Sequence, residues 1–140
     1  MNDAQNTQAN KQANTQAKNR VLIVEDDSFL SDLLANKFAT GEFDMTYAAS
    51  GKQALEIIGE DPTPDLILLD IRLPDMDGYE VLQAMKQNPK TAAVPVIVFS
   101  NFGAESDIAK SKELGALRHL VKVNVSLSQL TEIVKNELTK

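Results

Sequence analysis

A chain of 140 residues, with 43% hydrophobic and 24% charged residues, is long enough to bury the core of one globular domain. The absence of cysteine excludes disulfides and thiolate metal sites, and no apolar stretch reaches the roughly 20 residues that span a bilayer, so we expect a cytoplasmic protein without a membrane partner. The formal net charge of −6 at pH 7 argues against direct binding to nucleic acid, because basic contacts to phosphates supply most of that affinity.

Residues 1–19 consist almost entirely of Asn, Gln, Ala and Thr, with no aliphatic side chain larger than Ala after Met1. Such a tract cannot bury enough apolar surface to offset the entropy lost on ordering. We therefore predict a disordered leader over residues 1–19, followed by one domain over residues 20–140.

From residue 20 onward, short apolar runs alternate five times with segments of helical periodicity. The runs, each predicted to form a strand, are VLIV (21–24), FDMTYAA (43–49), LILL (66–69), VPVIVF (94–99) and LRHLV (117–121). The helical stripes are Phe29, Leu30, Leu33, Leu34 and Phe38; Leu55, Ile57 and Ile58; Val81, Leu82 and Met85; a weaker set, Ile108, Ala109 and Leu114, in 104–114; and Leu127, Leu130, Val134 and Leu138.

Helix-start and helix-stop signals support this division of the chain. Capping boxes are predicted for Ser50 with Gln53, Asp77 with Glu80 and Ser126 with Gln129, and Gly115 stands where a helix end favours a left-handed residue. Five β–α units in sequence predict an α/β fold, a doubly wound five-stranded parallel sheet with helices on both faces. The continuous apolar runs are typical of strands covered on both sides.

Polar residues suited to phosphate and cation chemistry follow four of the five runs. They are Glu25, Asp26 and Asp27 after the first run, Asp70 after the third, Ser100 after the fourth and Lys122 after the fifth. Because doubly wound sheets bind ligands beyond the carboxyl ends of their strands, we expect these side chains to converge.

The chemistry of the group requires these residue types. Clustered carboxylates raise one another's pKa unless a divalent cation neutralises them, and carboxylate oxygens suit Mg²⁺. With the metal bound, Asp70 can act as a nucleophile and form an acyl phosphate. The Lys122 ammonium and the Ser100 hydroxyl would then help the metal to hold the phosphoryl oxygens.

Each of these residues also has an ordinary structural interpretation. Asp26 or Asp27 fits the cap of a helix that begins near Ser28, Ser100 fits a turn, and Lys122 fits a solvated strand end. In the loop after Asp70, Asp75 and Asp77 fit loop and cap positions, while Pro74 and Gly78 fit the turn itself. Their joint placement at the strand ends favours the functional interpretation.

The segments VLIVEDD, PDLILLDIRLPDMDGYEVL, VPVIVFS and GALRHLVK, with their spacing, resemble the receiver domain of two-component response regulators over residues 20–139. The resemblance implies a flavodoxin-like (βα)5 sheet with strand order 2-1-3-4-5. It implies the following roles: Asp70 as phosphoacceptor, Asp26 as direct Mg²⁺ ligand, Glu25 acting largely through water, the backbone carbonyl of Arg72 as a further ligand, Ser100 as switch hydroxyl and Lys122 as phosphate partner. The phosphodonor would be a histidine kinase or phosphotransfer protein, and the downstream partner is an unidentified protein.

Two positions depart from the family pattern. Val123 follows Lys122, where the family usually has a proline after a cis peptide; a cis bond before a non-proline residue costs about 2.5–4 kcal/mol, so we expect a trans bond and a different loop. His119 stands where the family usually has a Tyr or Phe switch, and its ring can also ionise near neutral pH.

The resemblance also suggests how the domain signals. No segment follows the last helix, so we expect a stand-alone domain that presents a changed surface over helix 104–114, strand 117–121 and helix 126–138. The loop SNFGAES (100–106) would respond first, and we expect Phe102 in this loop to be exposed.

Three other functions stay open. One is a receiver-like binding scaffold that phosphate does not control. The second is an aspartyl-phosphate hydrolase, but Arg72 stands where such enzymes resemble one another in having a second Asp. The third is a dinucleotide-binding protein, and no Gly-x-Gly-x-x-Gly follows the first run. We expect no enzyme activity beyond gain and loss of the protein's own phosphoryl group.

Overall fold

The computed structural model describes residues 18–140. Its elements in chain order are β1 (Asn19–Val24), α2 (Ser28–Lys37), β2 (Phe43–Ala48), α3 (Gly51–Ile58), β3 (Leu66–Leu69), α4 (Gly78–Gln87), β4 (Val96–Ser100), α5 (Glu105–Glu113), β5 (Arg118–Val121), the 3-10 helix η1 (Lys122–Asn124) and α6 (Leu127–Leu138).

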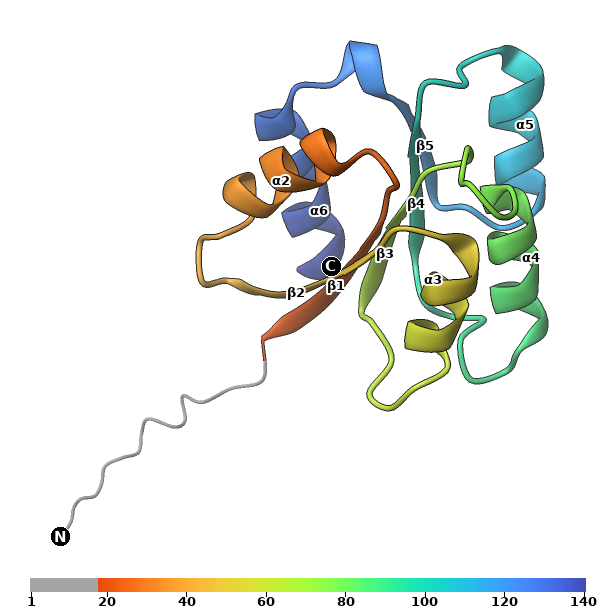
Figure 1. Cartoon of the computed structure of the whole chain (residues 1–140), viewed down its shortest axis with the longest axis horizontal. Helices are drawn as coiled ribbons and strands as arrows, with labels where there is room; N and C mark the ends of the chain where they lie inside the picture. Colours follow the sequence, from red (N-terminus) through yellow and green to blue (C-terminus); the bar gives the residue numbers. More distant parts are fainter. Residues whose placement is uncertain (1–17) are drawn as a thin grey trace, which may run out of the picture.

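The five strands form one parallel sheet in the order β2-β1-β3-β4-β5, which confirms the predicted α/β fold and strand order (Figure 1). The strand β1 begins at Asn19, one residue before the expected start of the domain. The rest of the predicted leader, apart from Lys18, lies outside the described residues.

Helices cover both faces of the sheet. The helices α2 and α6 lie on one face, and α3, α4 and α5 lie on the other (Figure 1). Side chains of β1, β3 and β4 alternate between two buried clusters, one under each helical layer. All four residues of β3 are buried, because this strand lies in the middle of the sheet and is covered on both sides.

One predicted helical stripe is partly wrong. Leu34 and Phe38 are buried and Leu30 packs against them, but Phe29 is 72% exposed and Leu33 is 38% exposed. The three core-facing residues recur at intervals of four, and each exposed residue precedes one of them in the chain. Phe29 and Leu33 therefore lie beside the buried stripe and are not part of it. The α4 stripe, in contrast, is buried throughout.

The helix caps follow the sequence signals closely. Asp77 with Glu80 and Ser126 with Gln129 form complete capping boxes. Ser50 accepts a bond from the Gln53 N–H, but the Gln53 side chain reaches back to the Ala49 N–H, one residue earlier than a capping box requires. Gly115 has φ +106 after α5, as its predicted left-handed position requires.

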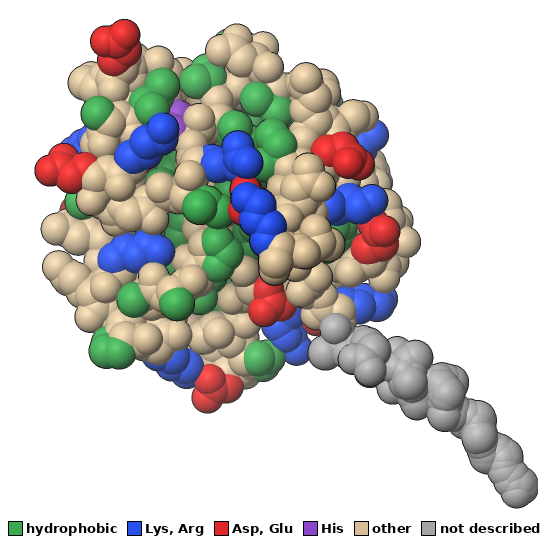
Figure 2. Space-filling model, turned by 180° about the vertical axis from the view of Figure 1, so that it is seen from behind, with side chains coloured by type: hydrophobic (Ala, Val, Ile, Leu, Met, Phe, Trp, Pro, Cys, Tyr) green, Lys and Arg blue, Asp and Glu red, His purple; other side chains and the backbone are tan. Residues whose placement is uncertain are grey.

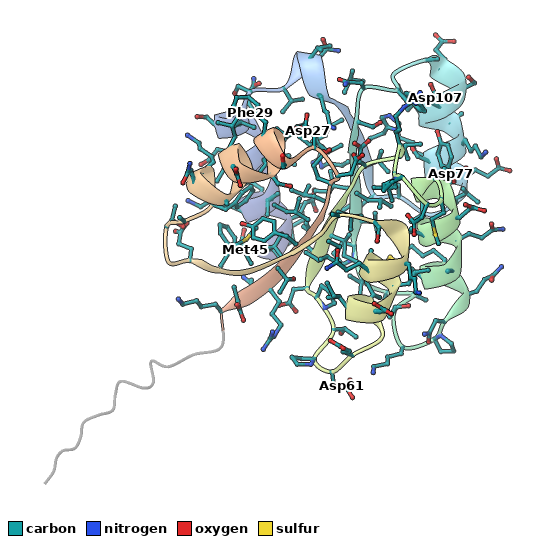
Figure 3. The ribbon with its side chains drawn as sticks, in the orientation of Figure 1. Asp27, Phe29, Met45, Asp61, Asp77 and Asp107 are labelled. Carbon is teal, nitrogen blue, oxygen red and sulfur yellow. The ribbon has the colours of Figure 1, made fainter. Side chains whose placement is uncertain are left out.

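Acidic residues stand at three helix N-termini at the same end of the sheet. Figure 3 shows Asp27, Asp77 and Asp107 at the beginnings of α2, α4 and α5, at the carboxyl ends of the strands, with Asp61 at the opposite end. Carboxylates are favoured beside the partial positive charge of a helix N-terminus. Within residues 18–140, no helix is both long enough and apolar enough to cross a membrane.

Candidate phosphorylation site

Four strand ends bring the predicted residues together at one edge of the sheet. Glu25 follows β1, Asp70 follows β3, Ser100 ends β4 and Lys122 follows β5. The first three are buried, with 4%, 6% and 1% of their surfaces exposed. They line a cavity of about 200 Å³ together with Asp26. A buried carboxylate needs a polar partner, so the partners of Asp70 decide what this cavity can do.

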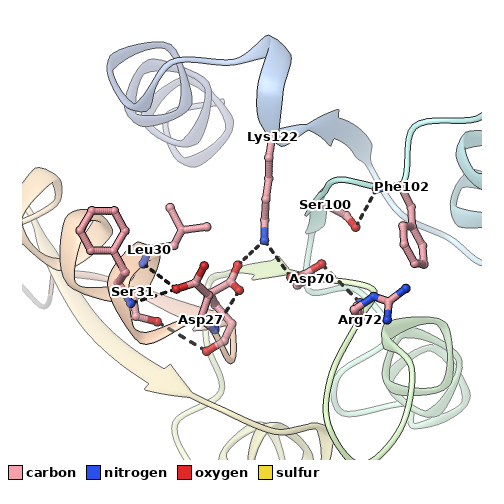
Figure 4. A network of polar contacts seen from close by, with 10 residues as sticks. Asp27, Leu30, Ser31, Asp70, Arg72, Ser100, Phe102 and Lys122 are labelled. Carbon is pink, nitrogen blue, oxygen red and sulfur yellow. Dashed lines mark hydrogen bonds and ion pairs between the residues drawn. The ribbon is translucent and has the colours of Figure 1, made fainter.

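Lys122 is the partner that Asp70 shares with Glu25. Its Nζ lies 2.8 Å from Asp70 Oδ2 and 2.7 Å from Glu25 Oε1 (Figure 4). Burial by itself lowers the pKa of Lys122, but the hydrogen bonds to the two carboxylates outweigh it, so the pKa of Lys122 is raised. The ammonium therefore stays charged between two acids.

For Glu25, in contrast, the surroundings favour the neutral form of the side chain. Burial raises the pKa of Glu25 above its ordinary value, and the charge of Asp70 raises it further, against the hydrogen bond from Lys122. Burial is the largest of these causes, and the single Lys122 ammonium, which Glu25 shares with Asp70, does not offset it. The site is short of positive charge.

The acidic cluster has the composition that a divalent cation needs. Carboxylate oxygens of Glu25, Asp26 and Asp70 lie within 4.8 Å of one another. Three carboxylates and one ammonium leave a formal charge of −2 when all are ionised, which one divalent cation neutralises. Hard oxygen donors with an exposed member, here Asp26, suit Mg²⁺ because it keeps several waters.

Backbone contacts orient the carboxylates. The Asp27 N–H donates to Glu25 Oε2 at 3.2 Å, while the Asp27 side chain caps α2 by accepting from Phe29 and Leu30. Asp27 is therefore the cap residue, as one of the two alternatives predicted, and Asp26 is left free for the cluster. The Arg72 N–H donates to Asp70 Oδ1 at 3.3 Å.

The loop after Asp70 is held close to the strand by Gly78. The Gly78 N–H donates to the Ile71 carbonyl, and a Cβ at Gly78 would overlap the Asp70 carbonyl oxygen. Asp75 accepts from the N–H groups of Gly51 and Lys52, which lowers the Asp75 pKa and ties the loop to the start of α3. These contacts agree with the structural interpretations of Asp75 and Gly78.

The peptide between Lys122 and Val123 is not cis, which confirms the expected trans bond. Lys122 begins the short helix η1, and Val123 is 83% exposed. With a trans bond after it, Lys122 still reaches Asp70, with Nζ 2.8 Å from Oδ2.

Phe102 is a residue whose place the sequence did not predict. We expected it to be exposed, but it is half-buried and packs against one of the core clusters. Its N–H donates to Ser100 Oγ at 3.2 Å, and its carbonyl accepts from His119 Nε2 at 2.6 Å. The other ring nitrogen of His119 is 2.9 Å from the hydroxyl of Ser111, which is buried in α5. A continuous set of hydrogen bonds thus links Ser100 to α5.

A family model described as the response regulator receiver domain matches residues 21–135. The chain belongs to the response regulator receiver family. Receiver domains act in two-component signalling, where they accept a phosphoryl group from a histidine kinase or a phosphotransferase. The acidic cluster of this receiver is consistent with a phosphorylation site.

Individual relatives agree with this assignment. The receiver is 37% identical over 119 residues to the sporulation initiation phosphotransferase F of Bacillus subtilis, with 85% of this chain and 93% of the relative covered. It aligns with the phosphorylated cyanobacterial phytochrome response regulator RcpA at a TM-score of 0.75 and 33% identity, covering 86% and 91% of the two chains. The Mn²⁺-bound response regulator Rcp1 aligns at a TM-score of 0.72 and 32% identity, covering 84% and 90%.

Proposed function

We propose that this receiver is phosphorylated on Asp70 in a reaction that requires Mg²⁺. The observation that carries the proposal is the position of the Asp70 carboxylate, which is buried, hydrogen-bonded to Lys122 and close to the oxygens of Glu25 and Asp26. The solved structure of Mn²⁺-bound Rcp1 is that of a relative, and it supports a divalent cation here.

Each residue of the site has its own role in the proposed phosphoryl transfer. A bound Mg²⁺, held by Glu25, Asp26, Asp70 and the Arg72 carbonyl, would neutralise the carboxylates and the incoming phosphate. One Asp70 oxygen then attacks phosphorus as the bond from phosphorus to the donor breaks, and the donor keeps the electron pair. Lys122 keeps its charge near Asp70 and pairs with a phosphoryl oxygen, while the Ser100 hydroxyl donates to another.

We further propose that the signal leaves the site through β4 and β5 toward the surface of α5, β5 and α6. Ser100 Oγ accepts a bond from the Phe102 N–H, so a movement of this oxygen toward the phosphate would weaken that bond, and Phe102 is bonded in turn to His119. His119 serves as the switch residue in this account. Phosphorylation would shift an existing equilibrium between two arrangements of these groups. The downstream partner would be a protein that binds one arrangement.

The test is intact mass after incubation with acetyl phosphate and Mg²⁺. The wild-type chain should gain one phosphoryl group, because its nucleophile, cation ligands and lysine are all present. Asp70→Asn and wild type in EDTA should gain none. The control Asp32→Asn, an exposed acid on α2, should be phosphorylated like wild type.

Two results would contradict the proposal. An adduct of equal yield in Asp70→Asn would place the phosphoryl group elsewhere, and equal yield in EDTA would remove the metal from the mechanism. A wild-type chain that gains no adduct would favour the scaffold interpretation instead. Turnover of small phosphate esters would favour a hydrolase.

A further inference from the structure

The loop between β3 and α4 is fastened to the start of another helix, α3. Both carboxylate oxygens of Asp75 accept from backbone N–H groups there, Oδ1 from Gly51 at 2.8 Å and Oδ2 from Lys52 at 2.9 Å. The next N–H of this helix, that of Gln53, is capped separately by the Ser50 hydroxyl at 3.1 Å. Helix α3 therefore receives two of its N-terminal caps from a residue that lies 23 and 24 positions further along the chain.

Met76 holds the same loop against α3 a second time. Its side chain is partly buried and packs against one of the core clusters. A Cβ at Gly51 would overlap Met76 Cγ, so the missing side chain at the first residue of α3 lets the loop approach this closely. Two consecutive loop residues, one polar and one apolar, thus fix the tip of the loop.

The base of the loop carries groups that belong to the cavity around Asp70. The Gly78 N–H donates to the Ile71 carbonyl, and the Arg72 N–H donates to Asp70 Oδ1 at 3.3 Å (Figure 4). Among residues 18–140, no N–H or O–H donates to the Arg72 carbonyl, which is the expected metal ligand of this loop. The loop is therefore held at its base by Gly78 and at its tip by Asp75, with Arg72 between them.

We propose that Asp75 is a positioning residue for the metal. By capping α3, it fixes the loop that carries the Arg72 carbonyl, and so it raises the affinity of the acidic cluster for Mg²⁺. Asp75 is neither a member of that cluster nor part of the cavity lining, so it acts through the loop. This inference rests on the proposed Mg²⁺-dependent phosphorylation of Asp70.

A fixed loop matters because Mg²⁺ demands near-ideal octahedral geometry from its ligands. A carbonyl on a loop that moves freely is a poorer ligand than one held in place by surrounding contacts. Loss of an N-cap of ordinary strength corresponds to a roughly two- to tenfold change in the population of the capped arrangement. The dissociation constant for Mg²⁺ should change by a similar factor.

The coupling between the cap and the metal has to be reciprocal. If the capped loop binds Mg²⁺ more tightly, then bound Mg²⁺ favours the capped loop by the same factor. Helix α3 should therefore respond to the metal, although none of its residues lines the cavity.

The first experiment is a calorimetric titration of the full chain with Mg²⁺ alone. Asp75→Asn replaces one acceptor oxygen with an NH₂ group, so only one of the two N–H groups of α3 can still be capped. The exposed position of Asp75 lets the variant fold. We expect its dissociation constant for Mg²⁺ to be roughly two- to tenfold higher than that of wild type.

The matched control is Ser50→Ala. This change removes the other cap of the same helix and leaves the loop after β3 untouched. Both variants should lower the melting temperature of the metal-free protein, but Ser50→Ala should bind Mg²⁺ like wild type. Equal weakening in the two variants would mean that any loss of α3 stability reduces metal binding, and the positioning role would be rejected.

A second control separates position from charge, because an exposed carboxylate also attracts Mg²⁺ over a distance. Interactions between exposed charges are screened beyond about 10 Å in 0.1 M salt and beyond about 3 Å in 1 M salt. The ratio of the dissociation constants of Asp75→Asn and wild type should therefore persist in 1 M KCl. A ratio that falls to one would show that Asp75 acts only through its charge.

The second experiment is amide hydrogen exchange in the presence and absence of Mg²⁺. In wild type, Mg²⁺ should slow exchange of the Gly51 and Lys52 amides roughly two- to tenfold, while the Gln53 amide, which is bonded to Ser50, keeps its rate. In Asp75→Asn the slowing should be lost. Equal slowing of all three amides, in the variant as in wild type, would show that the metal stabilises the whole domain and would overturn the inference.

The outcomes for this inference and for the proposed function can be told apart. Equal Mg²⁺ affinity in wild type and Asp75→Asn, in a chain that is phosphorylated on Asp70, would overturn the positioning role and leave the proposed function intact. A wild-type chain that binds no Mg²⁺ would overturn both.

Discussion

Glu25 is a buried acid whose own burial works against its charge. It is 4% exposed, and the pKa of its carboxyl is raised by burial first and by Asp70 second. A carboxyl group whose pKa is higher in the folded than in the unfolded protein favours folding at low pH. That contribution is lost as the pH rises through the folded-state pKa.

Replacement of Glu25 by Gln should therefore raise the melting temperature of the metal-free protein at pH 7. The amide keeps the shape of the side chain without a buried negative charge, so the repulsion from Asp70 disappears. The gain over wild type should shrink as the pH falls through the raised pKa of Glu25, and it should vanish below the ordinary value of about 4.5, where the Glu25 carboxyl is neutral in the folded and the unfolded protein alike. Calorimetry in EDTA at several pH values measures this difference.

Glu56→Gln is the control for that experiment. Glu56 is exposed on α3, so its replacement should leave the melting temperature within experimental error of wild type at every pH. Added Mg²⁺ should stabilise wild type more than Glu25→Gln, because the metal compensates a charge that the variant lacks. A Glu25→Gln protein that melts at or below the wild-type temperature at pH 7 would show that the Lys122 bond outweighs the cost of burial.

The site residues divide into those that a sequence can predict and those that it cannot. Glu25, Asp70, Ser100 and Lys122 each follow an apolar run, and the carboxyl ends of parallel strands meet at one edge. Their convergence was therefore predictable. The contact between the Arg72 guanidinium and the Phe102 ring joins two loops that are 30 residues apart, and no periodicity in either loop indicates it.

At the scale of elements, the order and type of the helices and strands were predictable because continuous apolar runs differ in period and length from helical stripes. The exposed face of α2 could not be predicted, because Phe29 and Leu33 on that face are as apolar as their buried neighbours. Helix α5 has few core-facing residues and one fully buried side chain, that of Ser111. Helix α5 therefore contributes little to either core cluster.

The element that should respond to phosphorylation is α5 with the loop before it. Ser111 Oγ lies 2.9 Å both from the Ile108 carbonyl oxygen within this helix and from His119 Nδ1, so a change at His119 would alter the bonding of α5 directly. We predict that beryllofluoride with Mg²⁺, a mimic of the phosphoryl group, shifts the amide NMR signals of residues 101–113 and the ring signals of His119.

The control element in that experiment is β2, which lies at the far edge of the sheet from β4 and β5. Its signals should stay where they are in the free protein. The same addition to Asp70→Asn should leave the whole spectrum unchanged. If only the signals of the loops around Asp70 shift, and those of His119 and α5 do not, signalling through this helix is disproved.

At the scale of the whole molecule, the face shown in Figure 2 carries charges of both signs interspersed rather than gathered in one stripe. The described residues, 18–140, include the five-stranded sheet, the helices on both of its faces and the residues of the site. Residues 1–17 include no aliphatic side chain larger than Ala after Met1. We therefore expect this segment to add nothing to the hydrophobic core.

Deletion of residues 1–17 should therefore leave both stability and chemistry unchanged. The free energy of unfolding should change by less than about 0.5 kcal/mol, as for other changes outside a packed region. The rate of adduct formation with acetyl phosphate should equal that of the full chain. A fall of several degrees in the melting temperature, measured beside the full-length protein, would show that the segment packs on the domain.

The most direct test of phosphorylation on Asp70 is chemical identification of the modified residue. Borohydride reduces an aspartyl acyl phosphate to homoserine, and it leaves free carboxylates unchanged. After treatment with acetyl phosphate, Mg²⁺ and then borohydride, peptide mass spectrometry of the segment 65–78 should show homoserine at position 70 and Asp at positions 75 and 77. Reduction at another acidic residue, or an unreduced segment from a chain that carries the phosphoryl group, would contradict the account.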